Sequence, residues 1–403
     1  MPDRGRPADG RPGQVVRLVA TAMATGGSAV ARQIGGRVVL VDGAIPGETV
    51  DAVVTSEHSN FARARVVAVL ESSPDRVSPP CPHVARGCGG CGWQHISAEA
   101  QRRAKLSLVT EALVRLGGVD APQVEPGPEL PTAGYRTTLR MAMGPERAGF
   151  RRYHGHDVVE VGECLVAHPL LGELVAEGDF GSAREVTLRC GAATGERLVL
   201  LAPTAAGASL PPSVLVVGED EIDSGRRAWI FEEVSGARLR VSARSFFQAS
   251  PGGAEALVGA VKAAAAGAGD GDLVDAYGGV GLFGATVGAG RPVTVLERSP
   301  SSSADARVNL PSAKVLRLDV ERWRPSPAAV VVADPPKTGL GKRAVAALAA
   351  SGTGHLVLVS CDAASLGRDA GLLAAEGFGL GSTTVVDMFP GTPHIETVSA
   401  FVR

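Results

Sequence analysis

The second half of the chain carries the pattern that most restricts the fold: short apolar runs alternate with loops and with segments of helical periodicity. The runs that read as parallel strands lie at residues 272–276, 293–297, 314–319, 329–334 and 356–360. Such alternation predicts a doubly wound parallel sheet that binds its ligands above the carboxyl ends of the strands. Two more strand-like runs, 383–389 and 396–402, end the sequence with no room for a helix between them, which predicts an antiparallel pair.

A chain of 403 residues with 45% hydrophobic and 20% charged residues has ordinary globular composition and is long enough for two or three domains. The polar first 13 residues do not form a signal peptide, and no run of about 18 apolar residues is present to span a membrane. We therefore expect a cytoplasmic protein. The net charge of −2 gives no global field for a nucleic acid, so such a partner would need local arginine clusters such as Arg102-Arg103 or Arg151-Arg152.

The first half of the chain divides into two regions. Residues 14–72 contain short β-branched runs separated by glycine turns, which predicts a small closed barrel. The tract 72–80 is rich in serine and proline and reads as a linker. From there to about residue 245 the pattern is irregular α+β, with one clear amphipathic helix at 98–116.

The cysteines are clustered. Cys81, Cys88 and Cys91 lie close together in the sequence, and Cys164 can serve as a fourth ligand. Four thiolates suit either zinc or an iron–sulfur cluster, and their spacing does not separate the two. We expect a metal site because the loop around Cys88 and Cys91 offers little apolar surface on which reduced thiols could pack. Cys190 lies alone in a strand-like run, and we expect it to be an inert core residue.

A glycine-rich loop follows the first strand of the predicted parallel sheet. Its glycines are Gly279, Gly281 and Gly284, and Glu297 lies 18 positions after the first of them. This arrangement matches the dinucleotide fingerprint, in which glycines let the backbone approach a phosphate. By itself the match is weak, because the same glycines can serve only to let a helix pack closely.

Three acidic residues at consecutive strand ends favour S-adenosylmethionine over NAD. Asp275 would place a carboxylate near the pyrophosphate of a dinucleotide, whereas the cationic methionine moiety of S-adenosylmethionine would welcome that charge. Glu297 can hold ribose hydroxyls, and Asp319 can reach the adenine amino group. A terminal antiparallel pair on a parallel sheet is also typical of S-adenosylmethionine methyltransferase domains rather than of dinucleotide dehydrogenases.

Cys361 follows the apolar run 355–360 and precedes a helical segment that begins at Ala363. A helix N-terminus lowers the pKa of a nearby thiol, which makes Cys361 a candidate nucleophile. The alternative is a small inert core residue, which is the commoner role of a lone cysteine at a strand end. The segment 334–337, Asp-Pro-Pro-Lys, ends the preceding strand and favours the catalytic role.

Taken together, these features resemble the RNA uracil-C5 methyltransferases of the TrmA and RumA type along nearly the whole chain. The residues that carry the likeness are Gly26–Arg32, Val38–Glu48, Cys91-Gly-Trp-Gln94-His95, Phe246-Phe247-Gln248, Cys361 and His394–Thr397. The resemblance implies an α/β protein in three parts: a small N-terminal β-barrel of the OB-like TRAM type, a central α+β domain with the cysteines, and a C-terminal Rossmann-like methyltransferase domain. The implied boundaries are a disordered tail at 1–13, the RNA-binding barrel at 14–73, the central domain at 74–96 and 119–245, and the methyltransferase domain at 97–118 and 246–403.

The resemblance also implies roles for single residues. Cys361 is the nucleophile and Glu396 the base. By the same likeness, Gln248, Tyr277, Glu297 and Asp334 contact S-adenosylmethionine or the substrate. The full set expected at the cofactor site adds the residues of the strand ends and the glycine-rich loop: Asp275, Gly279, Gly281 and Asp319. The residues that take the positions of [4Fe–4S] ligands, which favours iron–sulfur over zinc, are Cys81, Cys88, Cys91 and Cys164.

The chain departs from the usual family pattern at a few positions. Asp362-Ala363 stands where Asn-Pro is common, Lys337 where Arg is common, and Ser250 where Asn is common. None of these changes removes a reacting group. A carboxylate at position 362 would, however, disfavour ionisation of the neighbouring thiol.

The implied reaction methylates carbon 5 of a uridine. The Cys361 thiolate adds to carbon 6 and makes carbon 5 nucleophilic toward the sulfonium methyl, and Glu396 then removes the carbon-5 proton so that the thiol is eliminated. The base must be flipped out of a stack or come from a loop. We expect a monomer that acts on RNA, with ribosomal RNA favoured over transfer RNA. The alternatives are a non-catalytic iron–sulfur RNA-binding protein, a NAD-dependent oxidoreductase, and a methyltransferase of DNA or a small molecule.

Overall fold

The computed structural model describes residues 12–33 and 35–403, which divide into two compact units. Unit 1 holds the described residues up to Val84 together with Cys91–Leu108 and Pro390–Pro393. Unit 2 holds Ala85–Gly90, Val109–Phe389 and His394–Arg403. The predicted tail at 1–13 lies outside the described residues, except for its last two residues, which form a turn.

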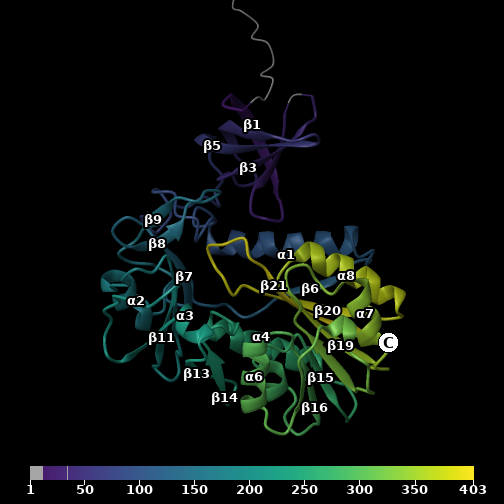
Figure 1. The fold of residues 1–403 in the computed structure, drawn as a ribbon. Helices are drawn as coiled ribbons and strands as arrows, with labels where there is room; N and C mark the ends of the chain where they lie inside the picture. The colour runs from purple at the N-terminus through teal and green to yellow at the C-terminus, as the bar shows by residue number, and fades with distance from the viewer. Residues whose placement is uncertain (1–11, 34) are drawn as a thin grey trace, which may run out of the picture. The chain divides into compact units, whose positions relative to one another are not determined.

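A closed five-stranded barrel forms the first part of unit 1 (Figure 1). Its strands are β1 (Val15–Met23), β2 (Ala29–Arg32), β3 (Val38–Asp42), β4 (Thr49–Glu57) and β5 (Phe61–Glu71). β1 pairs with both β2 and β4, which closes the ring in the order β1-β2-β3-β5-β4. Alternate positions point inward and are buried, and many are alanine because a five-stranded ring encloses little space. The predicted small barrel is confirmed.

Buried side chains hold the rest of unit 1 to the barrel. Glu48 is fully buried and accepts two hydrogen bonds from the guanidinium of Arg76, which follows the barrel. Trp93 is 1% exposed; its indole donates to the carbonyl of Gly27 in the barrel, and its backbone N–H donates to the carbonyl of Gly391. The cysteine-containing segment and the loop around Gly391 are thereby fixed to the barrel within this unit.

Unit 2 begins with a six-stranded sheet and a separate hairpin. The strands of the sheet, in the order β12-β11-β10-β7-β8-β9, are β7 (Thr138–Met143), β8 (Ala148–Arg151), β9 (Val158–Glu160), β10 (Glu185–Cys190), β11 (Arg197–Ala202) and β12 (Val214–Gly218). Helix α2 (Pro169–Glu177) packs on one face of this sheet. The hairpin of β13 (Trp229–Val234) and β14 (Ala237–Ser242) shares an apolar cluster with residues of the other face, so both faces are covered. Helix α3 (Glu219–Asp223) follows β12.

An eight-stranded sheet forms the rest of unit 2, in the order β17-β16-β15-β18-β19-β21-β20-β6. Its strands are β6 (Gln123–Pro126), β15 (Leu273–Ala276), β16 (Val293–Leu296), β17 (Lys314–Leu316), β18 (Val330–Ala333), β19 (His355–Ser360), β20 (Gly379–Val386) and β21 (Glu396–Val402). The first five strands in this order are parallel, and β21 lies antiparallel between β19 and β20. The predicted α/β class, the parallel sheet and the terminal antiparallel pair are confirmed.

Helices accompany this sheet as the alternating pattern requires (Figure 1). They are α4 (Pro251–Ala264), α5 (Leu282–Thr286), α6 (Pro300–Asn309), α7 (Gly341–Ala349) and α8 (Ala363–Ala375), with a short 3₁₀ turn, η1 (Val320–Arg322). The early helix α1 (Ala98–Arg115) contributes its last turns to unit 2, where Gly367 of α8 lies against the backbone of Ala112. Within the two described ranges, no helix is both long enough and apolar enough to cross a bilayer.

Candidate active site

The strand register gathers the predicted site residues of unit 2 at one edge of its large sheet. Ala276, the last residue of β15, pairs with Leu296 of β16 and with Ala333 of β18. Tyr277, Glu297 and Asp334 are the next residues of these strands, and Cys361 follows the last residue of β19. Because these strands are parallel, all four residues leave the sheet at the same edge.

The glycine-rich loop after β15 has a backbone that few side chains allow. Tyr277, Gly279 and Gly281 all have positive φ, at 58°, 56° and 92°. A Cβ on Gly281 would come within 2.6 Å of Leu310, whereas the space at Gly279 is open. The loop therefore packs against Leu310 at Gly281, whereas the space beside Gly279 is open and a ligand could approach the backbone there.

Asp275 differs from the expectation that it presents a charge to the cofactor. Its side chain is fully buried, its Oδ2 accepts a hydrogen bond of 2.8 Å from the backbone N–H of Gly284, and its Oδ1 is buried without a hydrogen-bond partner. Burial, only partly offset by the Gly284 hydrogen bond, raises its pKa to about 7. The carboxyl thus holds the loop to the start of α5, and much of it is protonated at neutral pH.

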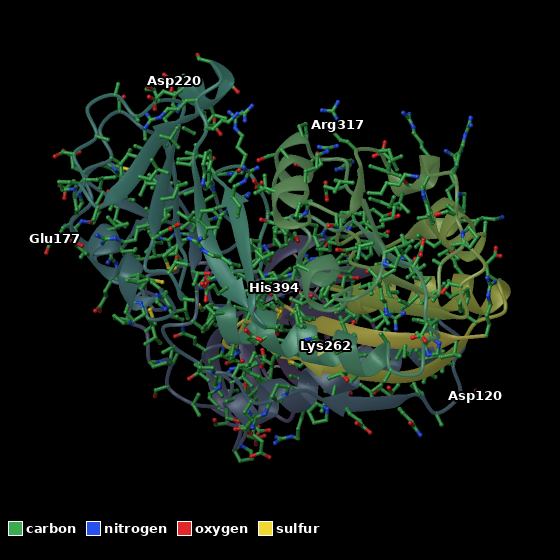
Figure 2. The ribbon with its side chains drawn as sticks, turned by 90° about the horizontal axis from the view of Figure 1, so that it is seen from below. Asp120, Glu177, Asp220, Lys262, Arg317 and His394 are labelled. Carbon is green, nitrogen blue, oxygen red and sulfur yellow. The ribbon has the colours of Figure 1, made fainter. Side chains whose placement is uncertain are left out.

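Glu297 and Asp319 lie beyond the strands that precede them. Glu297 is half-buried and accepts hydrogen bonds from the backbone N–H groups of Gly279, at 3.0 Å, and Ser299, at 2.5 Å. Strand β17 is shorter than the predicted 314–319, so Asp319 is not at its end but at the start of η1, 3.9 Å from the Arg298 guanidinium. In Figure 2, Arg317 marks the chain just beyond β17.

Two further predicted residues lie near these. The hydroxyl of Tyr277 has its pKa raised by burial and by neighbouring carboxylates, of which Glu321 contributes most. Gln248 is 9% exposed and donates from Nε2 to Oδ2 of Asp334 at 3.5 Å. Burial, reinforced by the charge of Asp275, raises the pKa of Asp334 to about 7. Asp334 is thus available both as a hydrogen-bond acceptor and, when protonated, as a donor.

Cys361 and Glu396 are brought together by the pairing of β19 with β21. Ser360 pairs with Thr397, and the Thr397 hydroxyl donates to the Ser360 carbonyl at 3.1 Å. Glu396 is 9% exposed at the start of β21, after the segment that His394 marks in Figure 2. The two candidate catalytic groups therefore occupy adjacent positions on neighbouring strands.

The expected lowering of the Cys361 pKa is wrong, because the surroundings of the thiol raise it. Burial, together with the charges of Glu396, Asp334 and Asp362, raises the pKa of this thiol to about 12. Desolvation and like charges outweigh the N-terminus of α8. The helix end is also satisfied by other means, because Asp362 accepts a hydrogen bond from the backbone N–H of Ser365.

The replacements relative to the family pattern have local roles. Asp362 is the N-cap of α8, a role that asparagine fills equally well. Ser250 is the N-cap of α4, where its hydroxyl accepts from the backbone N–H of Gly253 at 3.2 Å. Lys337 is exposed in the loop after β18.

The four clustered cysteines are half-buried and are divided between the units, with Cys81 and Cys91 in unit 1 and Cys88 and Cys164 in unit 2. Four thiols have the donor chemistry of an iron–sulfur site. Across the described parts of the chain, however, no three His, Cys, Asp or Glu residues are arranged to hold a metal ion. Cys190 is buried in the core of the central sheet, as expected.

Sequence reasoning missed one buried polar group in unit 2. Asp305 and Asn309 of α6 bind the hairpin strand β14, and Asn309 also binds Val280 in the glycine-rich loop. Both residues occur in a polar helix, and their spacing of four places them on one face. That spacing is a weak signal, because it becomes meaningful only once β14 is known to pass beside the helix.

Comparison with known proteins agrees with this architecture. Residues 11–67 match the model of the TRAM domain. The chain is also similar to a solved structure, the tRNA (uracil-54, C5)-methyltransferase of Pyrococcus abyssi in complex with S-adenosyl-L-homocysteine, with a TM-score of 0.73 and 23% identity over 96% of this chain and 100% of that one. The chain therefore combines a TRAM domain with a domain of the methyltransferase fold.

Relatives in bacteria identify the family. The chain is 34% identical to an uncharacterized RNA methyltransferase of Streptomyces avermitilis, over 94% of this chain and 95% of the relative. It is 33% identical to another of Corynebacterium efficiens, over 97% and 95% of the two chains. The chain belongs to this family of RNA methyltransferases, which confirms the family that the sequence indicated.

Proposed function

We propose that the protein transfers a methyl group from S-adenosylmethionine to carbon 5 of a uridine in RNA. The observation that carries this proposal is the meeting of one thiol, Cys361, with two carboxyl groups, Glu396 and Asp334, at the ligand-binding edge of a methyltransferase sheet. A methyltransferase that only positions a nucleophilic substrate has no need of such a thiol. Methylation of an unreactive pyrimidine carbon does need one.

The residues present fit S-adenosylmethionine. The open space above Gly279, the half-buried carboxylate of Glu297 and the partly exposed Asp319 lie along the edge at which such folds bind their ligands. This acidic set suits a cationic ligand better than a pyrophosphate. When bound, S-adenosylmethionine would supply an electrophilic methyl group.

The chain's own residues would prepare the uridine. The thiol of Cys361 would release its proton to solvent and add as the thiolate to carbon 6. The electron pair of the carbon 5–carbon 6 double bond then moves to carbon 5, which would form a bond to the methyl group as the methyl–sulfur bond breaks. Asp334, protonated in part at neutral pH, donates a hydrogen bond to the uracil edge, and Gln248 orients Asp334. Glu396 then removes the proton from carbon 5, which restores the double bond and expels the thiol.

The proposed substrate is ribosomal RNA, with transfer RNA as the second candidate. The enzyme from Pyrococcus abyssi acts on uracil 54 of tRNA, and its fold resembles that of this chain. The barrel carries side chains of the kinds that bind unpaired RNA: the rings of His58 and Phe61 stack at 4.4 Å, and the Arg63 guanidinium lies over Phe61. These side chains suit an unpaired RNA segment of either source.

The covalent step can be tested by trapping. In Glu396→Gln, the methylated adduct should form but fail to eliminate, so a protein–RNA species should persist on a denaturing gel when S-adenosylmethionine and RNA are present. The double variant Glu396→Gln with Cys361→Ala should give none. An adduct that survives loss of Cys361 would assign the nucleophile elsewhere.

We further propose that Cys81, Cys88, Cys91 and Cys164 hold a [4Fe–4S] cluster. The support is their number, their thiol chemistry and their spacing in the sequence. Anaerobic reconstitution should give about four irons per chain, the count of one such cluster, and Cys88→Ser should reduce it sharply, while Cys190→Ser should not. Stoichiometric zinc in the purified protein and no uptake of iron would contradict the proposal.

A further inference from the structure

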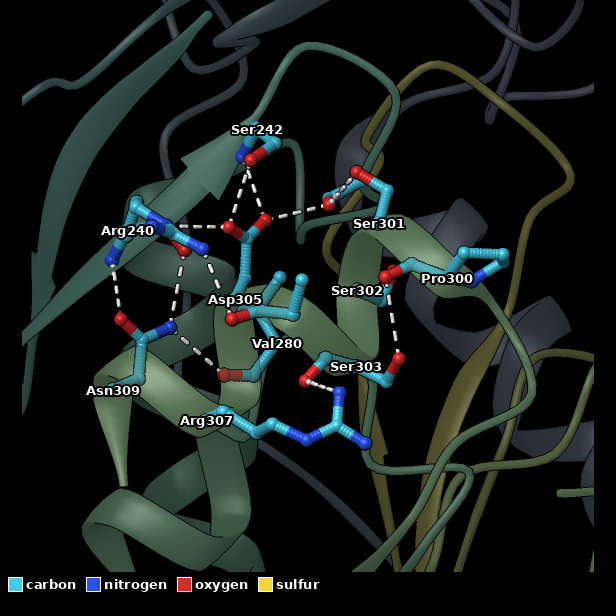
Figure 3. A network of polar contacts seen from close by, with 12 residues as sticks. Arg240, Ser242, Val280, Pro300, Ser301, Ser302, Ser303, Asp305, Arg307 and Asn309 are labelled. Atoms are coloured by element: carbon cyan, nitrogen blue, oxygen red, sulfur yellow. Dashed lines mark hydrogen bonds and ion pairs between the residues drawn. The ribbon is translucent and has the colours of Figure 1, made fainter. Parts of the chain in front are cut away.

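Helix α6 carries a fully buried carboxylate that the proposed reaction does not use. Asp305 is 0% exposed and accepts four hydrogen bonds (Figure 3). The donors are Nε of Arg240 at 2.6 Å, the backbone N–H and hydroxyl of Ser242 at 2.8 and 2.7 Å, and the hydroxyl of Ser245 at 2.6 Å. A buried carboxylate with both oxygens satisfied by several donors is held rigidly.

Asn309 extends this group by one helical turn. Its Oδ1 accepts from the backbone N–H of Arg240 at 2.8 Å, and its Nδ2 donates to the carbonyls of Arg240 at 3.1 Å and Val280 at 2.9 Å (Figure 3). Because a backbone N–H can only donate and a carbonyl can only accept, these three partners fix the orientation of the amide. We call Asp305 and Asn309 the α6 hub.

The α6 hub joins two segments of the candidate cofactor site. Val280 lies between Gly279 and Gly281 in the loop above which the ligand space is open. Ser245 directly precedes Phe246-Phe247-Gln248, the segment whose glutamine reaches Asp334. Helix α6 therefore holds both the glycine-rich loop, through Val280, and the start of the Phe-Phe-Gln segment, through Ser245.

The central sheet is connected to the same group. Arg189 of β10 is 5% exposed and donates from Nη1 to the carbonyl of Ser242 at 3.0 Å. Ser242 thus binds Arg189 through its carbonyl and Asp305 through its N–H and hydroxyl. The contacts run without interruption from the central sheet to the cofactor loop.

We propose that Asn309 and Asp305 are positioning residues that set the conformation of the cofactor loop and of the Phe-Phe-Gln segment for binding of S-adenosylmethionine. The loop backbone has positive φ at residues 277, 279 and 281, so it is not part of a helix or strand that would hold it in place. The bond from Asn309 to Val280 supplies such a restraint from outside the loop. This inference rests on the proposed cofactor.

The test uses a nearly isosteric change, Asn309→Asp, in the full chain. It keeps an acceptor for the N–H of Arg240 but places a second oxygen where the two carbonyls require a donor, so the bond to Val280 is lost. The matched control is Ser303→Ala on the same helix, which removes one buried hydroxyl whose hydrogen bond, 3.2 Å to the Pro300 carbonyl, stays within α6.

Two readouts are compared: amide hydrogen exchange of residues 277–284 without ligand, and the Kd for S-adenosylhomocysteine by calorimetry. We expect Asn309→Asp to exchange faster in this loop and to bind about fivefold or more weakly, the effect of losing one hydrogen bond, with RNA affinity unchanged. Ser303→Ala should match the wild type in both.

Equal exchange and equal Kd in the two variants would overturn the inference. If the wild type fails to bind S-adenosylhomocysteine, the proposed cofactor is wrong, and the exchange result still decides the role of the hub.

Discussion

Cys361 is half-buried next to Glu396 and Asp334, and burial and these neighbouring charges raise the pKa of its thiol well above neutral pH. Burial of their own side chains likewise raises the pKa of Asp334 and of Asp275 to about 7. A site that contains several acids and a thiol avoids accumulating negative charge by keeping protons. The arrangement suits a nucleophile that ionises only when its substrate arrives, rather than one that is reactive at rest.

The charge of Glu396 should be measurable through the reactivity of Cys361. Below the thiol pKa, alkylation by iodoacetamide should rise about tenfold for each pH unit, because the thiolate fraction does so. In Glu396→Gln the pKa of Cys361 should fall, since Glu396 is the largest charged contributor to its elevation. At pH 8 we therefore expect alkylation several-fold faster than in the wild type, measured at the Cys361 peptide by mass spectrometry.

A matched control is Glu376→Gln, which removes the same charge from the exposed C-terminal end of α8. It should leave the rate at Cys361 unchanged. Equal alkylation rates in Glu396→Gln and the wild type would contradict the placement of Glu396 beside the thiol.

Asp275 should make the stability of the protein depend on pH. Its pKa is about 7 when folded and about 3.9 when unfolded, so between these values the folded state holds a proton that the unfolded state lacks. Stability must then fall as pH rises from about 4 to 7. Asp275→Asn keeps an acceptor for the N–H of Gly284 but cannot ionise, so it should not lose stability over this range. The free energy of unfolding of the variant, relative to that of the wild type, should therefore increase by about 2–4 kcal/mol between pH 4 and pH 7.

Urea unfolding at several pH values measures this difference. The exposed Asp272, three residues earlier in the chain, provides the control Asp272→Asn, which should change the free energy of unfolding by no more than about 0.5 kcal/mol. A pH-independent difference for Asp275→Asn would show that Asp275 is ionised when folded.

Sequence reasoning predicted which candidate residues lie together better than it predicted their protonation states. Cys361, Glu396 and Asp334 are brought together as the motifs indicated. Their protonation could not be predicted, because burial and the neighbouring charges come from strands far apart in the sequence. Asp275 was assigned a charge facing the cofactor for the same reason, since its depth below the loop is a tertiary property.

Among the elements, the strand alternation predicted the large sheet well because a buried parallel strand is short, apolar and followed by a helix. The alternating pattern did not predict two features of this sheet. β6 adds to β20 at the edge of the sheet from a position more than 250 residues earlier in the chain. β17 ends at Leu316, earlier than its apolar pattern suggested, because the chain turns into η1.

The contact between α1 and α8 gives a sharp test at this scale. A Cβ on Gly367 would clash with the carbonyl oxygen of Ala112, a backbone atom that cannot easily move. A Cβ on Gly371, one turn later, would meet nothing closer than 3.6 Å. We expect Gly367→Ala to destabilise by about 1–3 kcal/mol through overpacking.

Gly371→Ala should instead stabilise by about 0.5–1 kcal/mol, because alanine favours a helix where space permits. Both effects can be followed by urea unfolding. If the two substitutions shift stability in the same direction, α1 and α8 do not pack as described.

At the scale of the whole molecule, the chain combines a TRAM barrel with a methyltransferase domain and belongs to a family of RNA methyltransferases. Its net charge of −2 means that RNA must be held by local contacts rather than by a general field. The barrel and the sheet were predictable because each follows from a short-range pattern. The division of the cysteines between two units was not, because the chain passes from one unit to the other within the cysteine motif itself.

The central claim is that Cys361 serves the methylation of uridine at carbon 5. Nucleoside mass spectrometry measures this most directly, on ribosomal and transfer RNA from a strain without 5-methyluridine, incubated with S-adenosylmethionine and either the wild type or Cys361→Ala. We predict new 5-methyluridine with the wild type alone, in ribosomal RNA before transfer RNA. Methylation that persists in Cys361→Ala, or a methylated nucleoside other than 5-methyluridine, would contradict the account.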